Sequence, residues 1–222
     1  ASTPMSRRLF AAMPEKNINS TTMLPAALRP TPDESGMTVP QLLEHRINAL
    51  FEQIPLVAEL GEAFAQAGHD LYLVGGSVRD ALMGRLGHDL DFTTDARPDD
   101  TEAILRQHTH ATWDIGRAFG TIGAQIDDWV VEVTTYRADA YHPDSRKPEI
   151  VYGETLKDDL IRRDFTVNAM ALHAATRTFS DPYAGLTDIV SGILRTPFPP
   201  ERSFSDDPLR MMRAARFTSQ LG

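Results

Sequence analysis

Apolar residues recur with two different periods along this chain, and their order predicts a mixed α/β domain. From residue 40 to residue 68 the period is helical and Pro55 interrupts it, so we expect two helices that cover one face of a sheet. Leu71–Val74 is a short apolar run typical of a buried strand. Thr121–Ile126 and Trp129–Tyr136 also have strand character, and the two aspartates between them predict a hairpin turn.

Four later or intervening segments have helical character. Residues 98–107 predict a helix between the first strands, and residues 156–172 predict a longer one that carries a dense polar insertion. Residues 181–189 predict a turn and a short helix. After a proline-rich stretch, a new helical segment begins near Ser205 and continues to the last residue.

Composition divides the chain into three parts. Residues 1–38 are rich in proline, serine, threonine and methionine without sustained periodicity, which predicts a mobile extension. This extension weakly resembles a transit peptide, but it lacks the hydrophobic core of a secretory signal. Residues 39–197 are expected to form the main domain. Residues 198–222 would begin a second, truncated helical unit, because a helix that is just starting has no partner here to bury its apolar residues.

Composition and charge exclude several classes of protein. The chain has 222 residues, of which 41% are hydrophobic, enough to bury one main core. The absence of cysteine excludes disulfides and thiolate zinc sites, and it is compatible with a cytoplasmic location, which we expect. The longest apolar stretches fall far short of the roughly 20 residues of a membrane span. A net charge of −9 argues against nonspecific nucleic-acid binding by the whole chain, although arginines crowd its C-terminal end.

The most informative segment is Gly75–Asp91, which reads GGSVRDALMGRLGHDLD. A glycine pair directly after a buried strand allows a tight turn that brings backbone amides close to a ligand. Ser77 can cap the helix that follows. The N-terminus of that helix offers unpaired N–H groups to phosphate, and Arg79 adds a cation. The glycine and lysine spacings of a Walker loop or a Rossmann fingerprint are absent.

Carboxylates in two strands are candidate metal ligands. Asp89 and Asp91 are two residues apart in a strand, so both side chains lie on one face and repel each other unless a cation sits between them. Oxygen-only ligation suits Mg²⁺, which takes its remaining ligands from water and substrate phosphates. Glu132 lies between valines, where a charge is costly unless it is paired. It is either a third carboxylate of the site or an outward-facing residue of a half-exposed sheet.

Taken in order, these motifs resemble the tRNA nucleotidyltransferase and poly(A) polymerase family, of the class with a polymerase-β-like catalytic head. The resemblance covers about residues 60 to 220. Gly75 to Asp91 looks like the family's metal-binding motif, which implies Mg²⁺ on Asp89 and Asp91. The same motif implies nucleotide contacts from Gly75, Gly76 and Arg79. Residues 162–168, RRDFTVN, resemble the ribose-recognising motif RRDxxxN, which implies that Arg163 and Asn168 serve the nucleotide.

Two further motifs lie near the C-terminus. Residues 181–189 are similar to the family's hinge motif, although Ala184 replaces the first of its usual two glycines. Residues 206–210, DDPLR, look like the base-selecting motif EDxxR, with an aspartate in place of the glutamate. The resemblance therefore assigns four residues to base recognition or to neighbouring contacts: Asp207, Arg210, Arg213 and Arg216.

The chemistry of Asp207 and Arg210 agrees with that assignment. On a helix these residues would lie about 60° apart, close enough to face one ligand. A carboxylate that accepts from an exocyclic amine, beside a guanidinium that donates to the adjacent ring nitrogen, suits cytosine and adenine. The simple alternative is a salt bridge on an exposed helix, and contacts from Arg213 and Arg216 to phosphate or RNA are equally compatible with the pattern.

The resemblance implies an α/β (α+β) nucleotidyltransferase head with a mixed sheet and flanking helices, followed by the start of a helical neck. It also implies an enzyme that adds CMP and AMP from CTP and ATP to the 3′ end of tRNA, with two Mg²⁺ ions. Poly(A) polymerases share these motifs and remain an alternative. Two other classes stay open: a noncatalytic nucleotide- or RNA-binding module, and a metal-dependent phosphohydrolase, which the lack of a histidine-rich cluster disfavours.

Overall fold

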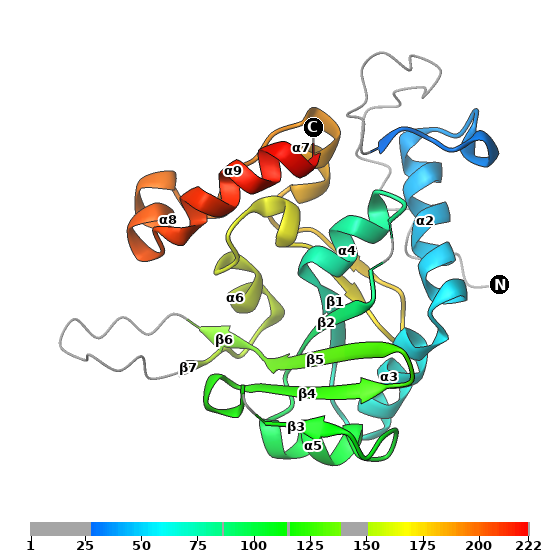
Figure 1. Cartoon of the computed structure of the whole chain (residues 1–222), viewed down its shortest axis with the longest axis vertical. Helices are drawn as coiled ribbons and strands as arrows, with labels where there is room; N and C mark the ends of the chain where they lie inside the picture. Colours follow the sequence, from blue (N-terminus) through cyan, green and yellow to red (C-terminus); the bar gives the residue numbers. More distant parts are fainter. Residues whose placement is uncertain (1–27, 86, 115, 139–150, 222) are drawn as a thin grey trace.

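A seven-stranded mixed sheet forms the centre of the protein, seen in a computed structural model that describes residues 28–85, 87–114, 116–138 and 151–221. The strand order is β3-β4-β5-β2-β1-β8-β9, and a separate two-stranded ribbon pairs β6 with β7. Within the large sheet β2 and β5 run parallel, whereas the other neighbours are antiparallel. The sequence prediction of a mixed sheet with flanking helices is therefore confirmed (Figure 1).

The strands are β1 (Leu71–Val74), β2 (Asp89–Thr94), β3 (Thr112–Trp113), β4 (Thr121–Ile126), β5 (Trp129–Thr135), β6 (Arg137–Ala138), β7 (Val151–Tyr152), β8 (Ala171–His173) and β9 (Phe179–Ser180). The helices are α2 (Val39–Gln53), α3 (Pro55–Gln66), α4 (Gly75–Leu82), α5 (Pro98–Leu105), α6 (Leu156–Ile161), α7 (Gly185–Ser191), α8 (Pro200–Asp206) and α9 (Leu209–Leu221). Short 3-10 turns are η2 (Pro32–Glu34), η3 (Arg117–Phe119) and η4 (Thr166–Asn168). No helix among these described residues is long and apolar enough to cross a bilayer.

One face of the central sheet is buried by helices and the other stays open. Leu90 and Phe92 of β2 and Val131 and Val133 of β5 are buried in the same core as the apolar residues of α2 and α3. The residues that alternate with them in β2 and β5 point the opposite way, and several are exposed. The alternation of apolar and polar residues in these two strands thus gives the sheet one buried face and one solvent-exposed face. Only the exposed face can bind a substrate.

Residues 28–38 correct the expected boundary of the mobile extension. Leu28 is buried in the core, and Glu34 and Arg46 form a buried ion pair with Nε and Oε1 2.9 Å apart. Arg46 also donates to the carbonyl oxygen of Leu82 at 2.9 Å, which ties this segment to the end of α4. The polar composition of residues 28–38 did not indicate these contacts. Each contact depends on one apolar side chain or one charge pair and not on a repeated spacing of apolar residues. Residues 1–27 lie outside the described part of the chain.

The helix expected over residues 156–172 was wrong beyond Ile161. The chain leaves the helix there, makes η4 and enters β8, which pairs with β1 in the register Leu73↔Leu172. Apolar spacing in so short a segment does not distinguish a helix from a buried strand, and an unpaired edge of β1 is satisfied by a strand rather than by a helix. After β5 the chain enters the short strand β6, and residues 139–150 lie outside the described part of the chain.

The single C-terminal helix expected from Ser205 is two helices. Asp207 separates them with extended backbone angles, φ −144° and ψ 96°, because the following Pro208 disfavours a helical conformation at the residue before it. The backbone N–H of Leu209 donates to Asp207 Oδ1 at 3.0 Å, so this aspartate stands before the first turn of α9. α8 and α9 lie together at one end of the molecule, away from β3 and α5 (Figure 1). The division into a head and a neck at residue 197 stays a prediction.

Candidate active site

Three carboxylates lie on the open face of two neighbouring strands. Asp89 and Asp91 are exposed residues of β2, and Glu132 is an exposed residue of the parallel strand β5. The register pairs Asp91 with Glu132, and paired residues of adjacent strands point to the same side of a sheet. The structure therefore brings together the three residues that the sequence analysis named as a possible metal site.

Repulsion among these carboxylates changes the acidity of Asp91. Burial raises its pKa, and the neighbouring charges of Glu132 and Asp89 raise it further, while Arg163 acts in the opposite direction. An uncompensated cluster of this kind is one that a cation would stabilise. Within the described residues, no group of three histidine, cysteine, aspartate or glutamate side chains is arranged to hold a metal ion alone. A metal here would need ligands from water or substrate in addition to the aspartates.

The glycine pair is the start of α4 rather than a turn before it. Gly75 has φ +67°, a left-handed conformation that glycine adopts without strain. A Cβ at this position would stand 2.9 Å from Nη1 of Arg163 and 4.0 Å from Oδ2 of Asp91. Because Gly75 has no side chain, a space remains between the end of β1, Asp91 and the guanidinium of Arg163.

Ser77 does not cap α4, contrary to the sequence prediction. The helix already begins at Gly75, so this serine is its third residue. Its hydroxyl instead lies against β2, where it donates to the carbonyl oxygen of Asp89 and accepts from the backbone N–H of Asp91, both at 3.2 Å. Ser77 therefore fixes the strand that carries the two aspartates against the helix.

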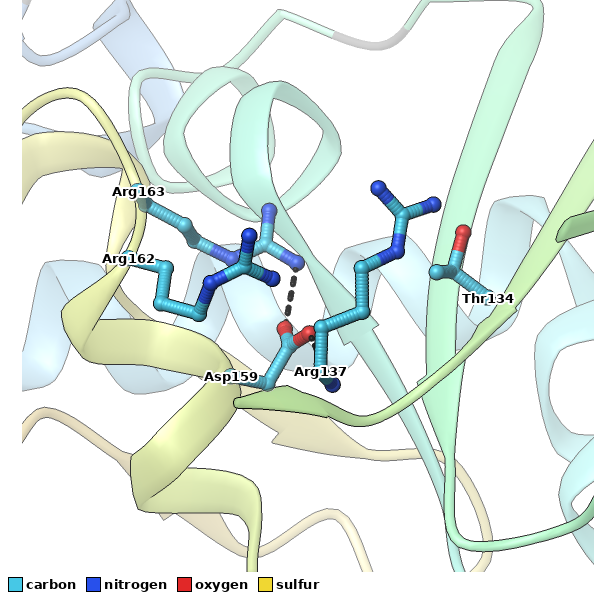
Figure 2. A pocket seen from close by; sticks show the side chains of 5 residues that line it. All are labelled: Thr134, Arg137, Asp159, Arg162 and Arg163. Carbon is cyan, nitrogen blue, oxygen red and sulfur yellow. Dashed lines mark hydrogen bonds and ion pairs between the residues drawn. The ribbon is translucent and has the colours of Figure 1, made fainter. Parts of the chain in front are cut away.

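A cationic cavity of about 260 Å³ lies beside the carboxylates (Figure 2). Its lining comprises Thr134, Arg137, Asp159, Arg162 and Arg163. The guanidinium of Arg163 donates to Oδ2 of Asp159 at 2.9 Å, and the backbone N–H of Arg137 donates to Oδ1 at 3.4 Å. The lining thus contains three guanidinium groups and one carboxylate, so the cavity has an excess of positive charge.

Two of these arginines have donor atoms without a partner. Nε of Arg137 and Nε of Arg163 are buried and make no hydrogen bond to any other described residue. Burial lowers the pKa of Arg137, and the adjacent Arg162 lowers it further. Because arginine stays protonated in proteins, an anion in the cavity would relieve this repulsion, whereas loss of a proton would not occur.

The sequence analysis did not single out Arg137, Thr134 or Asp159 as site residues. Thr134 shares a face of β5 with Glu132, Arg137 begins β6, and Asp159 lies in α6 four residues before Arg163. A useful signal was available in the sequence: positions 132 and 134 share a face of the expected strand. The contribution of Asp159 depends on how α6 packs, which no local pattern indicates.

Arg79 and Asn168, both expected at the nucleotide, are bonded to each other. Nη1 of Arg79 donates to Oδ1 of Asn168 at 2.6 Å, and its other nitrogens pair with Asp80. The guanidinium also lies 5.0 Å from the ring centroid of Phe217 in α9. Asn168 in turn donates to Asp164 at 2.9 Å. Arg79 therefore connects α4, η4 and α9, and in this conformation it is 8% exposed.

The C-terminal motif residues form a second cluster around Asp207. Nη2 of Arg213 lies 3.4 Å and Nε of Arg210 lies 3.9 Å from Oδ2 of this aspartate. Arg210 also donates to Ser203 Oγ at 2.6 Å and to the carbonyl oxygen of Arg162 at 2.7 Å. The helical-wheel argument for Asp207 was wrong, because this residue precedes α9, but its pairing with Arg210 persists. Arg216 is exposed, with its guanidinium 5.2 Å from the Phe217 ring centroid.

Comparisons with known proteins agree with this architecture. A family model described as the poly A polymerase head domain matches residues 71–195. The CCA-adding enzyme of Bacillus subtilis (strain 168) is 44% identical over 158 residues, which cover 71% of this chain and 38% of the relative. The residues matched by the family model contain the carboxylate row and the cationic cavity, and the chain spans well under half of that relative's length.

Two solved structures resemble the chain over a similar extent. The Bacillus stearothermophilus CCA-adding enzyme in complex with CTP has 37% identity and a TM-score of 0.65, covering 75% of this chain and 39% of that one. A tRNA nucleotidyltransferase complexed with a primer tRNA and an incoming ATP analog has 34% identity and a TM-score of 0.59, covering 71% and 44%. Sequence and structure therefore identify the same group of relatives.

Proposed function

This chain belongs to the poly A polymerase head domain family, and from that premise we propose that it is the catalytic part of a tRNA nucleotidyltransferase. It would add CMP and AMP from CTP and ATP to the 3′ end of tRNA. The relatives named above are CCA-adding enzymes or tRNA nucleotidyltransferases, and those solved in complexes hold CTP, or a primer tRNA and an ATP analog. The observation that supports the proposal most is the row of Asp89, Asp91 and Glu132 beside a cationic cavity.

The donor set fits divalent metal ions, and Mg²⁺ in particular. Asp89 and Asp91 supply only oxygen ligands, and desolvation together with the charges of Glu132 and Asp89 raises the pKa of Asp91. When bound, two Mg²⁺ ions would supply activation of the attacking hydroxyl and neutralisation of the leaving pyrophosphate. Glu132 lies in register with Asp91 and would add a third negative group at the position of the attacking hydroxyl.

The glycine start of α4 and Arg163 would orient the triphosphate. The backbone N–H groups of Gly75 and Gly76 lie at a helix N-terminus, where the partial positive charge favours phosphate. Arg163 reaches the space above Gly75 and places its Nη1 near Asp91. This fixed cation would stabilise charge that develops on the phosphates during transfer.

Base selection requires that the Asp207 cluster open. Both donors of Arg210 toward Ser203 and Arg162 are occupied in this conformation. We propose that a cytosine or adenine base exchanges for these partners, so that Asp207 accepts from the base amine and Arg210 donates to the ring nitrogen. Arg79 and Asn168 would then act on the nucleotide through the position of α9, with Arg213 and Arg216 on the same helix.

A poly(A) polymerase is the second candidate, because the matching family model bears that description. The deciding experiment offers Mg²⁺ and each labelled nucleoside triphosphate to tRNAs that end before CCA or after CC, and to an unrelated RNA. Addition of C and then A to tRNA alone would support CCA addition. Long A tails on any RNA would support a poly(A) polymerase. Hydrolysis of the triphosphate in the absence of RNA would support a phosphohydrolase.

The matched controls replace carboxylates at and away from the row. Asp89→Ala and Asp91→Ala should abolish transfer, whereas Asp128→Ala in the β4–β5 turn should leave it unchanged. If neither the wild-type protein nor any variant transfers nucleotides but RNA still binds, the chain is a binding module.

A further inference from the structure

β4 lies beside β5, on the opposite side of that strand from β2 and β1. Its exposed face is therefore next to Glu132 and far from the start of α4. In the order β3-β4-β5-β2-β1, the carboxylates of β5 and β2 separate β4 from Gly75 at the end of β1. The register pairs Gly123 with Glu132 and Thr121 with Thr134. Gly123 and Thr121 therefore share the face of the carboxylate row, at the side opposite to the proposed triphosphate position.

Trp113 covers Gly123 on this face. Its indole occupies the space where a Cβ on Gly123 would stand, so only glycine allows the ring to lie directly on the strand. Trp113 is partly exposed and pairs with Gly123 across the β3–β4 ladder. The ring consequently lies two strands from Asp91, next to Glu132, with part of its surface open to solvent.

Arg137 of β6 brings a cation to Thr121, which lies two residues before Gly123 in β4. Its Nη2 donates to Oγ1 of Thr121 at 2.9 Å, while its buried Nε has no partner among the described residues. Figure 2 shows its guanidinium extending along β5 beside Thr134, away from Asp159. An aromatic ring over Gly123 and a guanidinium at Thr121, with one unpartnered donor, thus lie two positions apart along β4, on the face that carries Glu132.

We propose that Trp113 and Arg137 hold the last nucleotide of the RNA acceptor, with the base stacked on Trp113 and a backbone phosphate bound by Arg137. This inference deepens the proposed function and rests on it for the identity of the acceptor. Aromatic rings bind single-stranded bases without sequence preference, and arginines bind the adjacent phosphates. The incoming triphosphate would lie at Gly75 and Arg163, and Arg163 lines the same cavity as Arg137, so the two sets of phosphates would be neighbours. An acceptor on β4 would present its 3′-hydroxyl toward Glu132 and Asp91.

Intrinsic fluorescence tests the stacking without any catalytic step. Trp129 packs from the opposite face of β5 against the core, so Trp129→Phe leaves Trp113 as the reporter and Trp113→Phe is the reverse control. A tRNA that ends before CCA should quench the Trp129→Phe protein to saturation. The Trp113→Phe protein should show little quenching, and CTP alone should quench neither.

Steady-state kinetics distinguishes two roles of the Trp113 ring: stacking on an RNA base, and covering Gly123 as part of the fold. Trp113→Leu keeps an apolar cover and should raise KM for tRNA about tenfold to a hundredfold, the range expected for loss of one base–aromatic stack. KM for CTP should not change, and Trp113→Phe should recover most of the loss. Phe119→Leu, at an exposed aromatic residue of η3, is the matched control and should change neither constant.

Salt dependence tests the phosphate contact. Arg137→Ala should weaken tRNA binding and reduce the slope of log Kd against log salt by about 0.7, the value for one phosphate of a single strand. Arg137→Lys should keep the slope and lose part of the affinity. Arg106→Ala, at the exposed arginine that directly follows α5, should alter neither.

The outcomes distinguish this inference from the proposed function. Quenching by CTP but not by tRNA, or tRNA affinity that neither Trp113→Leu nor Arg137→Ala changes, would overturn the inference even if transfer is robust. If the protein transfers no nucleotide to tRNA, the proposed function fails, while saturable quenching by the RNA end would still support the surface.

Discussion

Nη1 of Arg163 lies 2.9 Å from the point where a side chain on Gly75 would begin. The first residue of α4 thus lies close to a cation that follows the end of α6, with Asp91 as the next neighbour. Glycine is therefore required twice at this position, once by its φ of +67° and once by the space that Arg163 occupies.

The two requirements can be separated with a second glycine. Gly75→Ala and Gly68→Ala should each lower the free energy of unfolding by about 1–2 kcal/mol, because both positions have positive φ. Only Gly75→Ala should also displace Arg163 and reduce nucleotide transfer, since a Cβ on Gly68 meets nothing within 4 Å. Urea unfolding and transfer rates measure the two effects. Equal activity in both variants would contradict the role of the space above Gly75.

The repulsion around Asp91 predicts a stability change of opposite sign with and without Mg²⁺. A raised pKa in the folded protein means that the charged form of Asp91 destabilises the fold, increasingly as the pH rises above the unfolded value. Asp91→Asn should therefore raise the free energy of unfolding at pH 7 in EDTA while abolishing transfer. Mg²⁺ should raise the melting temperature of the wild type more than that of Asp91→Asn. The exposed turn variant Asp128→Asn should respond to Mg²⁺ like the wild type.

The Glu34–Arg46 pair predicts a loss of stability in acid. Hydrogen bonds from Arg46 lower the pKa of Glu34 from 4.5 to about 2, although burial acts in the opposite direction. A lowered pKa contributes stability that is complete above pH 4.5 and disappears as the pH falls through about 2. The contribution amounts to about 3 kcal/mol at pH 7, at roughly 1.4 kcal/mol per pH unit.

Glu34→Gln measures this contribution directly. The difference in unfolding free energy between the wild type and Glu34→Gln should be largest near pH 6 and should shrink steadily from pH 4.5 to pH 2.5. Glu62→Gln, at an exposed position of α3, should differ from the wild type by less than about 0.5 kcal/mol throughout. A constant difference for Glu34→Gln across this range would exclude the buried charge pair as its cause.

Ala184 predicts a rare stabilising substitution to glycine. Its backbone has φ 58° and ψ 33°, a left-handed conformation that costs a residue with a Cβ about 1–2 kcal/mol. Ala184→Gly removes that cost but adds chain entropy to the unfolded state, so the net gain should be at most about 1 kcal/mol. Ala103→Gly, in the exposed part of α5, should instead lose about 1 kcal/mol. Thermal melting of both variants shows whether each substitution raises or lowers the stability of the protein. A lower stability of both variants would show that Ala184 is unstrained.

The sequence by itself determined the elements whose signals are local. The strand period sets the shared face of Asp89 and Asp91, Pro55 separates α2 from α3, and the paired aspartates close the β4–β5 hairpin. Each of these depends on side-chain alternation or on a restricted φ, which act over a few residues. The order of motifs also indicated the family before any contact was known.

Only the tertiary structure decided which distant residues meet. Glu132 joins Asp91 because β5 happens to pair with β2, and β8 replaces the predicted helix because β1 needs a partner along its edge. Arg79 bonds to Asn168, 89 residues away in the sequence, and Arg137 lines the cavity beside Arg162. These pairings are set by hydrogen-bond satisfaction and charge compensation across long sequence separations, and no periodic pattern records such interactions.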